Sequence, residues 1–283
     1  MRTLRSFVAT AVVLANLFVV NHALADEAEV HYRTAVTLKQ QGRLDEALRE
    51  AREAIRLRPS FAAAHLTAGS ILRQQNHLED ALPYFRRVAE LEPNSGTGHA
   101  AYGAVLVRLH HLDNGVSELR RAVELDPRDT ASMGNLGSAL RELHRNGEAI
   151  AVLETALRTA PNDAVLLNNL GVTLRAERRY TDAIPVFERA LAAANGDAQI
   201  ELNLAIALRS AERFEDAIPH YQHVITSQPT NSNAVFDLGV CYERLHRRDD
   251  AVRTYRQYAD LVRARDAEGA ARAEERIRAV ESQ

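Results

Sequence analysis

The chain has 283 residues, 46% of them hydrophobic, which is enough to bury a large core. Its 35 basic and 38 acidic residues nearly balance, so it lacks the basic excess typical of nucleic-acid-binding proteins. The single cysteine, Cys241, excludes an internal disulfide and a cysteine-rich zinc site, and we expect it to be a small packed side chain.

Residues 1–25 have the pattern of a secretory signal peptide. Arg2 and Arg5 provide a charged start, an apolar run covers residues 7–20, and Ala23 and Ala25 are the small residues before an expected cleavage after Ala25. The apolar run is short for a membrane-spanning helix, so we expect no integral membrane span. An uncleaved membrane anchor is the alternative. The pattern predicts a periplasmic or secreted protein.

From residue 28 onward the chain repeats every 34 residues without insertion or deletion. The seven units are 28–61, 62–95, 96–129, 130–163, 164–197, 198–231 and 232–265, and positions are counted below from the first residue of a unit. Position 8 is always small, and in five units it is glycine: Gly69, Gly103, Gly137, Gly171 and Gly239. Glycine within a helix costs about 1 kcal/mol relative to alanine. Five glycines at one position therefore indicate close approach between two helices.

The unit 164–197 shows the pattern most fully. Its first half has Leu170, Gly171 and Leu174, and its second half has Ala183 and Phe187 at fixed spacing. This pattern resembles the tetratricopeptide repeat family. The resemblance implies an all-α, right-handed α-solenoid of seven helix-turn-helix repeats over residues 26–265, each with a helix A and a helix B, and we see no second domain.

The ends of the helices also carry signals. Pro83, Pro185 and Pro219 are expected near the start of helix B, where a missing N–H matters less. The pair Asn195-Gly196 replaces a closing proline in the fifth repeat and predicts a left-handed turn. Residues 266–283 are predicted to form a charged C-terminal capping helix. Its apolar residues at helical spacing are Ala270, Ala273, Ile277 and Val280.

In this family, positions 2, 5, 6, 9, 12 and 13 of helix A line the concave face, and these offsets form one stripe of a helix with about 3.6 residues per turn. In repeats 4 to 6, position 6 is always asparagine and position 12 is always arginine. We predict a ligand groove formed by Asn135, Asn169, Asn203, Arg141, Arg175 and Arg209, together with Asn168, Leu202 and Phe236. Lys39 and Arg73 hold position 12 in repeats 1 and 2, and repeat 3 is apolar along the stripe.

An asparagine amide both donates and accepts, as a peptide unit does. The row resembles the asparagine ladder with which the repeat superhelix of O-linked N-acetylglucosamine transferase grips an extended peptide. The alternatives are that asparagine follows the repeat consensus and that the arginines are solvated last-turn cations. Three hydrogen bonds contribute roughly 3 kcal/mol, whereas a millimolar complex needs about 4 kcal/mol. Apolar contacts or the arginines must therefore contribute to binding.

No catalytic motif, phosphate-binding loop or paired CxxC is present, so we expect no enzyme activity and no cofactor. His31, His65 and His99 share position 4 and are expected to pack rather than to bind a metal. His220 and His223 lie one helical turn apart, which is a weak metal signal. We expect no metal site.

These observations predict an envelope adaptor or assembly factor that binds an extended segment of a partner protein in its concave groove. One alternative is an accessory protein that binds an acidic polysaccharide through Arg141, Arg175 and Arg209. Another is a scaffold that assembles by end-to-end stacking of copies.

Overall fold

The structure is a computed structural model that describes residues 24–282. Most of the predicted signal peptide therefore lies outside the described residues. Residues 24–40 are helical. The helices that follow are α2 (Leu44–Leu57), α3 (Ala62–Gln74), α4 (Leu78–Leu91), α5 (Gly96–Arg108), α6 (Leu112–Leu125), α7 (Thr130–Glu142), α8 (Asn146–Thr159), α9 (Ala164–Ala176), α10 (Tyr180–Ala193), α11 (Ala198–Ser210), α12 (Phe214–Ser227), α13 (Ser232–Arg244), α14 (Arg248–Val262) and α15 (Ala267–Glu281).

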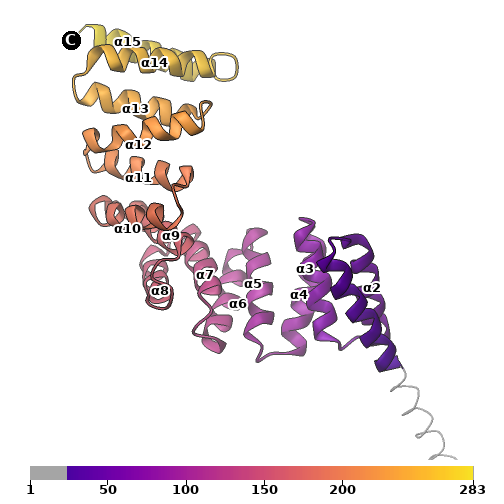
Figure 1. Cartoon of the computed structure of the whole chain (residues 1–283). Coiled ribbons are helices and arrows are strands. Elements are labelled where there is room, and N and C mark those ends of the chain that lie inside the picture. Colours follow the sequence, from indigo (N-terminus) through magenta and orange to yellow (C-terminus); the bar gives the residue numbers. More distant parts are fainter. Residues whose placement is uncertain (1–23, 283) are drawn as a thin grey trace, which may run out of the picture. The chain divides into compact units, whose positions relative to one another are not determined.

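The fold is all-α, with about seven helix pairs and a capping helix, as predicted (Figure 1). Two compact units are present, one ending at Ala139 and the other beginning at Leu140, so that the boundary falls within α7. In the first unit, each helix from α2 to α5 packs on the helix that follows it. In the second unit, each helix from α8 to α14 packs on the helix that follows it. Helix A of a repeat is thus α3, α5, α7, α9, α11 or α13, and helix B is the helix that follows it.

The small residue at position 8 lies directly under the large residue at position 24. A Cβ added to Gly171 would lie 2.6 Å from the Phe187 ring, and one added to Gly239 would lie 2.7 Å from the Tyr255 ring. Gly69 and Gly103 face Phe85 and Leu119 in the same way. Since all four of these large side chains are buried, the ring or branch has no room to move aside. The predicted packing reason for the glycines is confirmed.

The turn from helix A to helix B has the same backbone in every repeat. Position 15 has a positive φ throughout, but only the first repeat has glycine there, Gly42. The other repeats use Asn76, His110, His144, Arg178, Glu212 and His246. In each turn the N–H of position 16 donates to the carbonyl of position 11, as Arg179 does to Leu174 at 2.9 Å. This is the Schellman ending, which satisfies the last carbonyls of helix A.

Two predictions about helix ends have different outcomes. Asn195 and Gly196 both have positive φ, as expected. The expectation for the prolines is wrong, because each is the sixth residue of its helix: Pro83 in α4, Pro185 in α10 and Pro219 in α12. Only the first four N–H groups of a helix lack an intrahelical partner. Each proline therefore removes one helical hydrogen bond.

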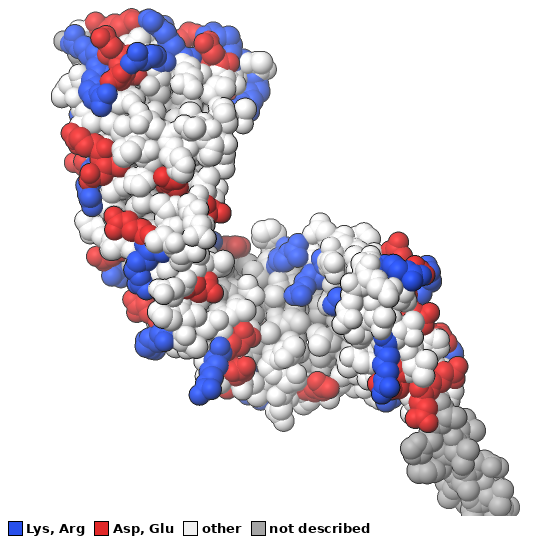
Figure 2. Space-filling view, in the orientation of Figure 1, with Lys and Arg blue, Asp and Glu red and all other residues white. Residues whose placement is uncertain are grey.

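The C-terminal helix α15 packs on α14 through the predicted apolar face. All four predicted contact residues, Ala270, Ala273, Ile277 and Val280, are buried. Figure 2 shows acidic and basic side chains gathered over α14 and α15, which is the polar exterior that an end of a solenoid needs. Among the helices of residues 24–282, none is long and apolar enough to cross a bilayer.

The substitution Gly171→Ala should destabilise the second unit. The added methyl meets the buried Phe187 ring at 2.6 Å, and overpacking of this kind costs about 1–3 kcal/mol, more than the helix propensity gained. Gly147→Ala in α8 is the matched control, because nothing lies within 4 Å of its added Cβ. Thermal unfolding should show a lower Tm for the first variant and an equal or higher Tm for the second. Equal Tm values would contradict the packing role.

The substitution Arg178→Gly should stabilise the same unit. Arg178 has a φ of 57°, and a left-handed conformation costs a non-glycine residue about 1–2 kcal/mol. Glycine removes that strain but is more flexible in the unfolded chain, so the net gain should be a few tenths to about 1 kcal/mol. Chemical denaturation should show a higher midpoint for Arg178→Gly than for Arg178→Ala, which keeps the strain. The opposite order would contradict the account of the turn.

Candidate functional site

The predicted groove residues of the second unit lie on consecutive A helices. In this unit α9 contacts α11, and α11 contacts α13. Asn169 of α9 is half-buried. Within residues 24–282 its backbone carbonyl accepts from Thr173, but its side-chain amide has no hydrogen-bond partner. Asn203 of α11 differs, since it is only 7% exposed and donates from Nδ2 to Oδ1 of Asn168 at 2.9 Å. Two predicted ligand residues, Asn168 and Asn203, therefore bind each other and join α9 to α11.

Arg209, the position-12 arginine of α11, is neutralised within the protein. Its Nε donates to the Tyr221 hydroxyl at 3.3 Å and lies 3.5 Å from Oδ1 of Asp237. The Tyr221 hydroxyl in turn donates to Oδ2 of Asp237 at 3.2 Å. Burial lowers the pKa of the Arg209 guanidinium, but Asp237 and Tyr221 raise it above the ordinary value. The three side chains form a closed polar network.

Arg175, the equivalent residue of α9, has neither partner. Position 24 of its repeat is Phe187 rather than tyrosine, and position 6 of the next repeat is Asn203 rather than aspartate. Burial, together with the positive charges of Arg141 and Arg209, lowers the pKa of the Arg175 guanidinium. Arg175 is therefore a half-buried cation that no carboxylate of residues 24–282 compensates.

The row of cations ends at α13, where position 12 is Glu243. Its carboxylate accepts from Arg276 of α15 at 2.8 Å and from the Tyr255 hydroxyl at 2.6 Å. Phe236 of the same helix packs on α14, with ring centroids 5.6 Å from Tyr255 and 5.0 Å from Tyr258. The charge at this end of the groove is thus paired internally.

The remaining predicted residues are more accessible. Leu202 of α11 is half-buried, as is Arg141 near the end of α7. Asn135 of α7 is exposed and belongs to the first unit, where it lines a pocket. The amide row predicted from position 6 is therefore not uniform, because Asn135 and Asn169 present their amides and Asn203 does not.

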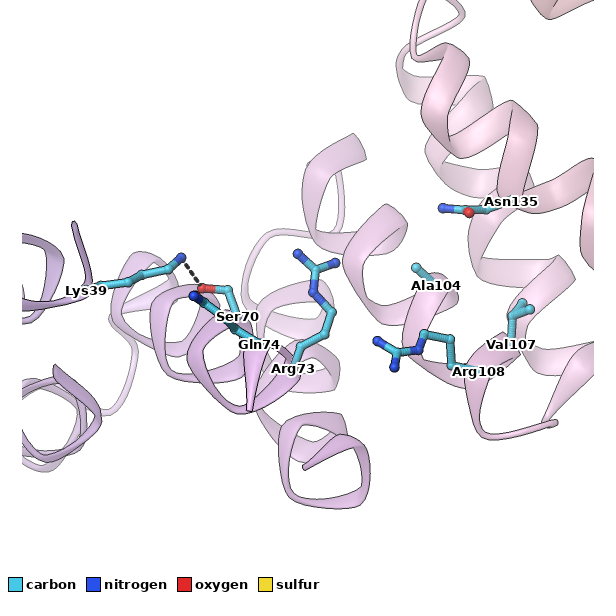
Figure 3. A pocket seen from close by; sticks show the side chains of 8 residues that line it. All are labelled: Lys39, Ser70, Arg73, Gln74, Ala104, Val107, Arg108 and Asn135. Atoms are coloured by element: carbon cyan, nitrogen blue, oxygen red, sulfur yellow. Dashed lines mark hydrogen bonds between the residues drawn. The ribbon is translucent and has the colours of Figure 1, made fainter. Parts of the chain in front are cut away.

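The pocket of the first unit has a volume of about 520 Å³ and lies on the inner stripe of helix 24–40, α3, α5 and α7 (Figure 3). It is lined by residues at positions 6, 9, 12 and 13: Lys39, Ser70, Arg73, Gln74, Ala104, Val107, Arg108 and Asn135. Three of these residues, Ser70, Gln74 and Arg108, are not among the groove residues predicted from the sequence. The signal for them was present, since positions 9 and 13 belong to the same helical stripe as positions 6 and 12.

The position-4 histidines form hydrogen bonds with helix B of their own repeat or with the turn that precedes it. Nδ1 of His31 lies 2.6 Å from Oε2 of Glu50, and His99 has the equivalent contact with Glu118. His65 is buried, with Nε2 3.0 Å from the Pro59 carbonyl. These contacts hold helix A against helix B or against the preceding turn. They agree with the expected packing role.

The remaining candidates for chemistry are also enclosed by protein. His220 and His223 both contact the buried carboxylate of Glu201. Within residues 24–282, no group of three or more His, Cys, Asp or Glu residues is arranged to hold a metal ion. Cys241 is fully buried, and burial raises the pKa of its thiol to about 12. The expectation of a small packed side chain at Cys241 is confirmed.

Comparison with known families agrees with the repeat pattern. The tetratricopeptide repeat model matches residues 32–96, 103–164, 135–198 and 202–270, well over half of the chain. Among curated protein sequences, none matches the chain. The family assignment thus rests on the repeats themselves.

Solved structures show the same fold at low sequence identity. YrrB, a TPR protein with an unusual peptide-binding site, has a TM-score of 0.54 and 24% identity over 64% of this chain and 90% of its own. A tetratricopeptide repeat protein from Parabacteroides merdae has a TM-score of 0.65 and 13% identity, covering 90% of this chain and 99% of its own. PilF of Pseudomonas aeruginosa has a TM-score of 0.65 and 20% identity, covering 76% and 97%.

The two asparagines of the second unit should respond differently to truncation. Asn203→Ala and Asn169→Ala gain the same helix propensity at the same repeat position, but only the first loses a hydrogen bond. Asn203→Ala should therefore be less stable than Asn169→Ala by about 1 kcal/mol. Urea unfolding of both variants measures the difference. Equal stability would mean that the Asn168–Asn203 contact contributes nothing.

Proposed function

Because the chain belongs to the tetratricopeptide repeat family, we propose that it is a non-enzymatic scaffold that binds an extended segment of a partner protein along the inner stripe of its A helices. Asn169 offers a free amide to the peptide backbone, and Arg175 offers a cation to a carboxylate of the partner. Leu202 supplies apolar contact beside them. The peptide-binding site of YrrB is a precedent for a peptide ligand in this fold.

Arg175 is the observation that carries this proposal. A half-buried cation without a counter-ion is unfavourable, because burial weakens its hydration and nothing replaces it. Arg209, one repeat further along, shows how the same position is neutralised when the protein provides an aspartate and a tyrosine. A carboxylate from a ligand would give Arg175 the negative counter-charge that Asp237 gives Arg209. Hydrogen bonds to charged groups contribute about 1.5–3 kcal/mol each, more than the asparagine contacts can.

The proposed location is the periplasm or the cell exterior, and the proposed role is that of an adaptor or assembly factor for an envelope complex. The support is the signal-peptide pattern of residues 1–25. Export would leave the repeats as the mature protein. The buried thiol of Cys241 would be protected from oxidants outside the cytoplasm.

A photo-crosslinking amino acid at position 169 should capture one discrete protein in intact cells. The same amino acid at position 188 is the control, since Glu188 is exposed on helix B of the same repeat. Adding Arg175→Gln to the position-169 probe should reduce capture about tenfold, which is the loss expected from one charged hydrogen bond. Capture is quantified by blotting and the partner identified by mass spectrometry.

Equal capture from positions 169 and 188 would contradict a groove-bound partner. Capture of glycan that weakens with salt would favour the acidic-polysaccharide alternative, because exposed charge contacts are screened by ions. Capture of a second copy of this chain would favour self-assembly.

A further inference from the structure

We propose that the first unit contains a second, separate ligand subsite, the pocket between helix 24–40, α3, α5 and α7, and that it binds an acidic extended polypeptide segment. The inference rests on the proposed function only in taking the ligand to be a polypeptide. All of the residues that line the pocket belong to the first unit. The site is therefore independent of Arg175 and its neighbours.

Three cations from three successive A helices face this pocket: Lys39, Arg73 and Arg108. Figure 3 shows the Arg73 and Arg108 side chains and the Asn135 amide directed into the same space. Their contacts are all with neutral groups. Lys39 donates to the Ser70 hydroxyl at 2.6 Å, Arg108 donates to Oδ1 of Asn76 at 2.8 Å, and the Arg73 guanidinium lies 5.8 Å from the Phe85 ring centroid.

The positive charge of the pocket is not compensated from within. Burial and the charge of Arg73 lower the pKa of the Lys39 ammonium, as expected for neighbouring cations that no anion separates. An adjoining pocket of about 410 Å³ shares Lys39, Arg73 and Asn135 and includes one acid, Asp129. That carboxylate accepts from the N–H and the hydroxyl of Ser132, which ties it to the first turn of α7. Figure 2 shows basic side chains over the region of α3 to α5 on a face with few acidic ones.

The shape and lining favour a polypeptide. The floor between the cations is formed by the small side chains of Ala104 and Val107, which admit a main chain closely. Gln74 and Asn135 at its sides can pair with peptide groups. No aromatic ring is among the residues that line the main pocket, so it lacks the flat faces on which sugar rings stack.

The spacing of the cations sets the expected spacing of the acids. The three cations stand on successive A helices, one on each helix. A polyproline II segment has about three residues per turn and rises about 3.1 Å per residue, so every third side chain points the same way about 9 Å further along. A segment with Asp or Glu at every third residue would therefore present one carboxylate to each cation-bearing helix.

The test uses a fluorescent twelve-residue peptide with Glu at every third position and Ala or Ser elsewhere, titrated with the full chain at low salt. Fluorescence anisotropy should show binding, and Arg73→Gln and Arg108→Gln should each weaken it about threefold to fivefold, as expected for loss of one exposed ion pair. Arg86→Gln is the matched control, because Arg86 is an exposed arginine on α4 outside the pocket. It should leave the affinity unchanged. A peptide with Gln in place of Glu should not bind.

Each other outcome overturns the inference in a distinct way. Equal affinities for Arg73→Gln, Arg108→Gln and Arg86→Gln would remove the pocket as a site. Binding that is lost only in Arg175→Gln would overturn the pocket while supporting the proposed function of the second unit. Polygalacturonate that binds through Arg73 and Arg108 when the peptide does not would overturn the ligand class. If the peptide binds the pocket but position 169 captures nothing, the proposed function fails and this inference stands.

Discussion

The close contact between position 8 of helix A and position 24 of helix B is the constraint on which the rest of the structure depends. Where position 8 is glycine, a ring or branched side chain lies within the space that a Cβ would occupy, as Phe187 does over Gly171. This brings the two helices together and fixes how helix A is rotated about its axis. Because helix A has a period of about 3.6 residues, that rotation determines which positions form the inner stripe. The ligand-facing residues are thus set by a packing contact that touches no ligand.

The same contact also decides which cations of the stripe remain available. A tyrosine at position 24 reaches across the contact between helix A and helix B, and its hydroxyl forms a hydrogen bond with position 12 of its own repeat. Tyr221 does so with Arg209, and Tyr255 with Glu243. A phenylalanine at position 24 packs equally well between helix A and helix B, but it has no hydroxyl with which to form a hydrogen bond. Phe187 and Phe85 therefore offer no hydroxyl to Arg175 and Arg73. The Tyr221 hydroxyl and the Asp237 carboxylate together make Arg209 a structural cation, whereas Arg175 has neither and could bind a ligand.

The strict 34-residue period made the fold predictable. It places the glycines at position 8 of the repeat, and that shared position indicates close helix packing, whereas the number of glycines in the chain does not. The turns were less predictable: Arg178 and Glu212 adopt positive φ although neither residue type favours it. Gly42 in the first repeat and Asn76 in the second are residue types that favour that conformation. In the site, Lys39, Arg73 and Asn135, which the stripe offsets placed on one face, line a common pocket. The offsets could not reveal that Asn203 binds Asn168 or that Arg209 binds Asp237, because those contacts join different repeats and depend on side-chain conformation.

These pairings change the energetic basis for binding. With Asn203 bonded to Asn168, Asn169 alone keeps a free amide among the position-6 asparagines of the second unit, and it contributes only about 1 kcal/mol, below the roughly 4 kcal/mol of a millimolar complex. In the first unit Lys39 is half-buried and Arg73 and Arg108 are exposed, so ion pairs with a ligand would contribute up to about 1 kcal/mol each. Together with the Asn135 amide, at about 1 kcal/mol, they reach that threshold. Asn135 then serves mainly to orient a main chain that these cations hold. Such binding selects a ligand by its spacing of negative charge, and it weakens as salt screens the exposed groups.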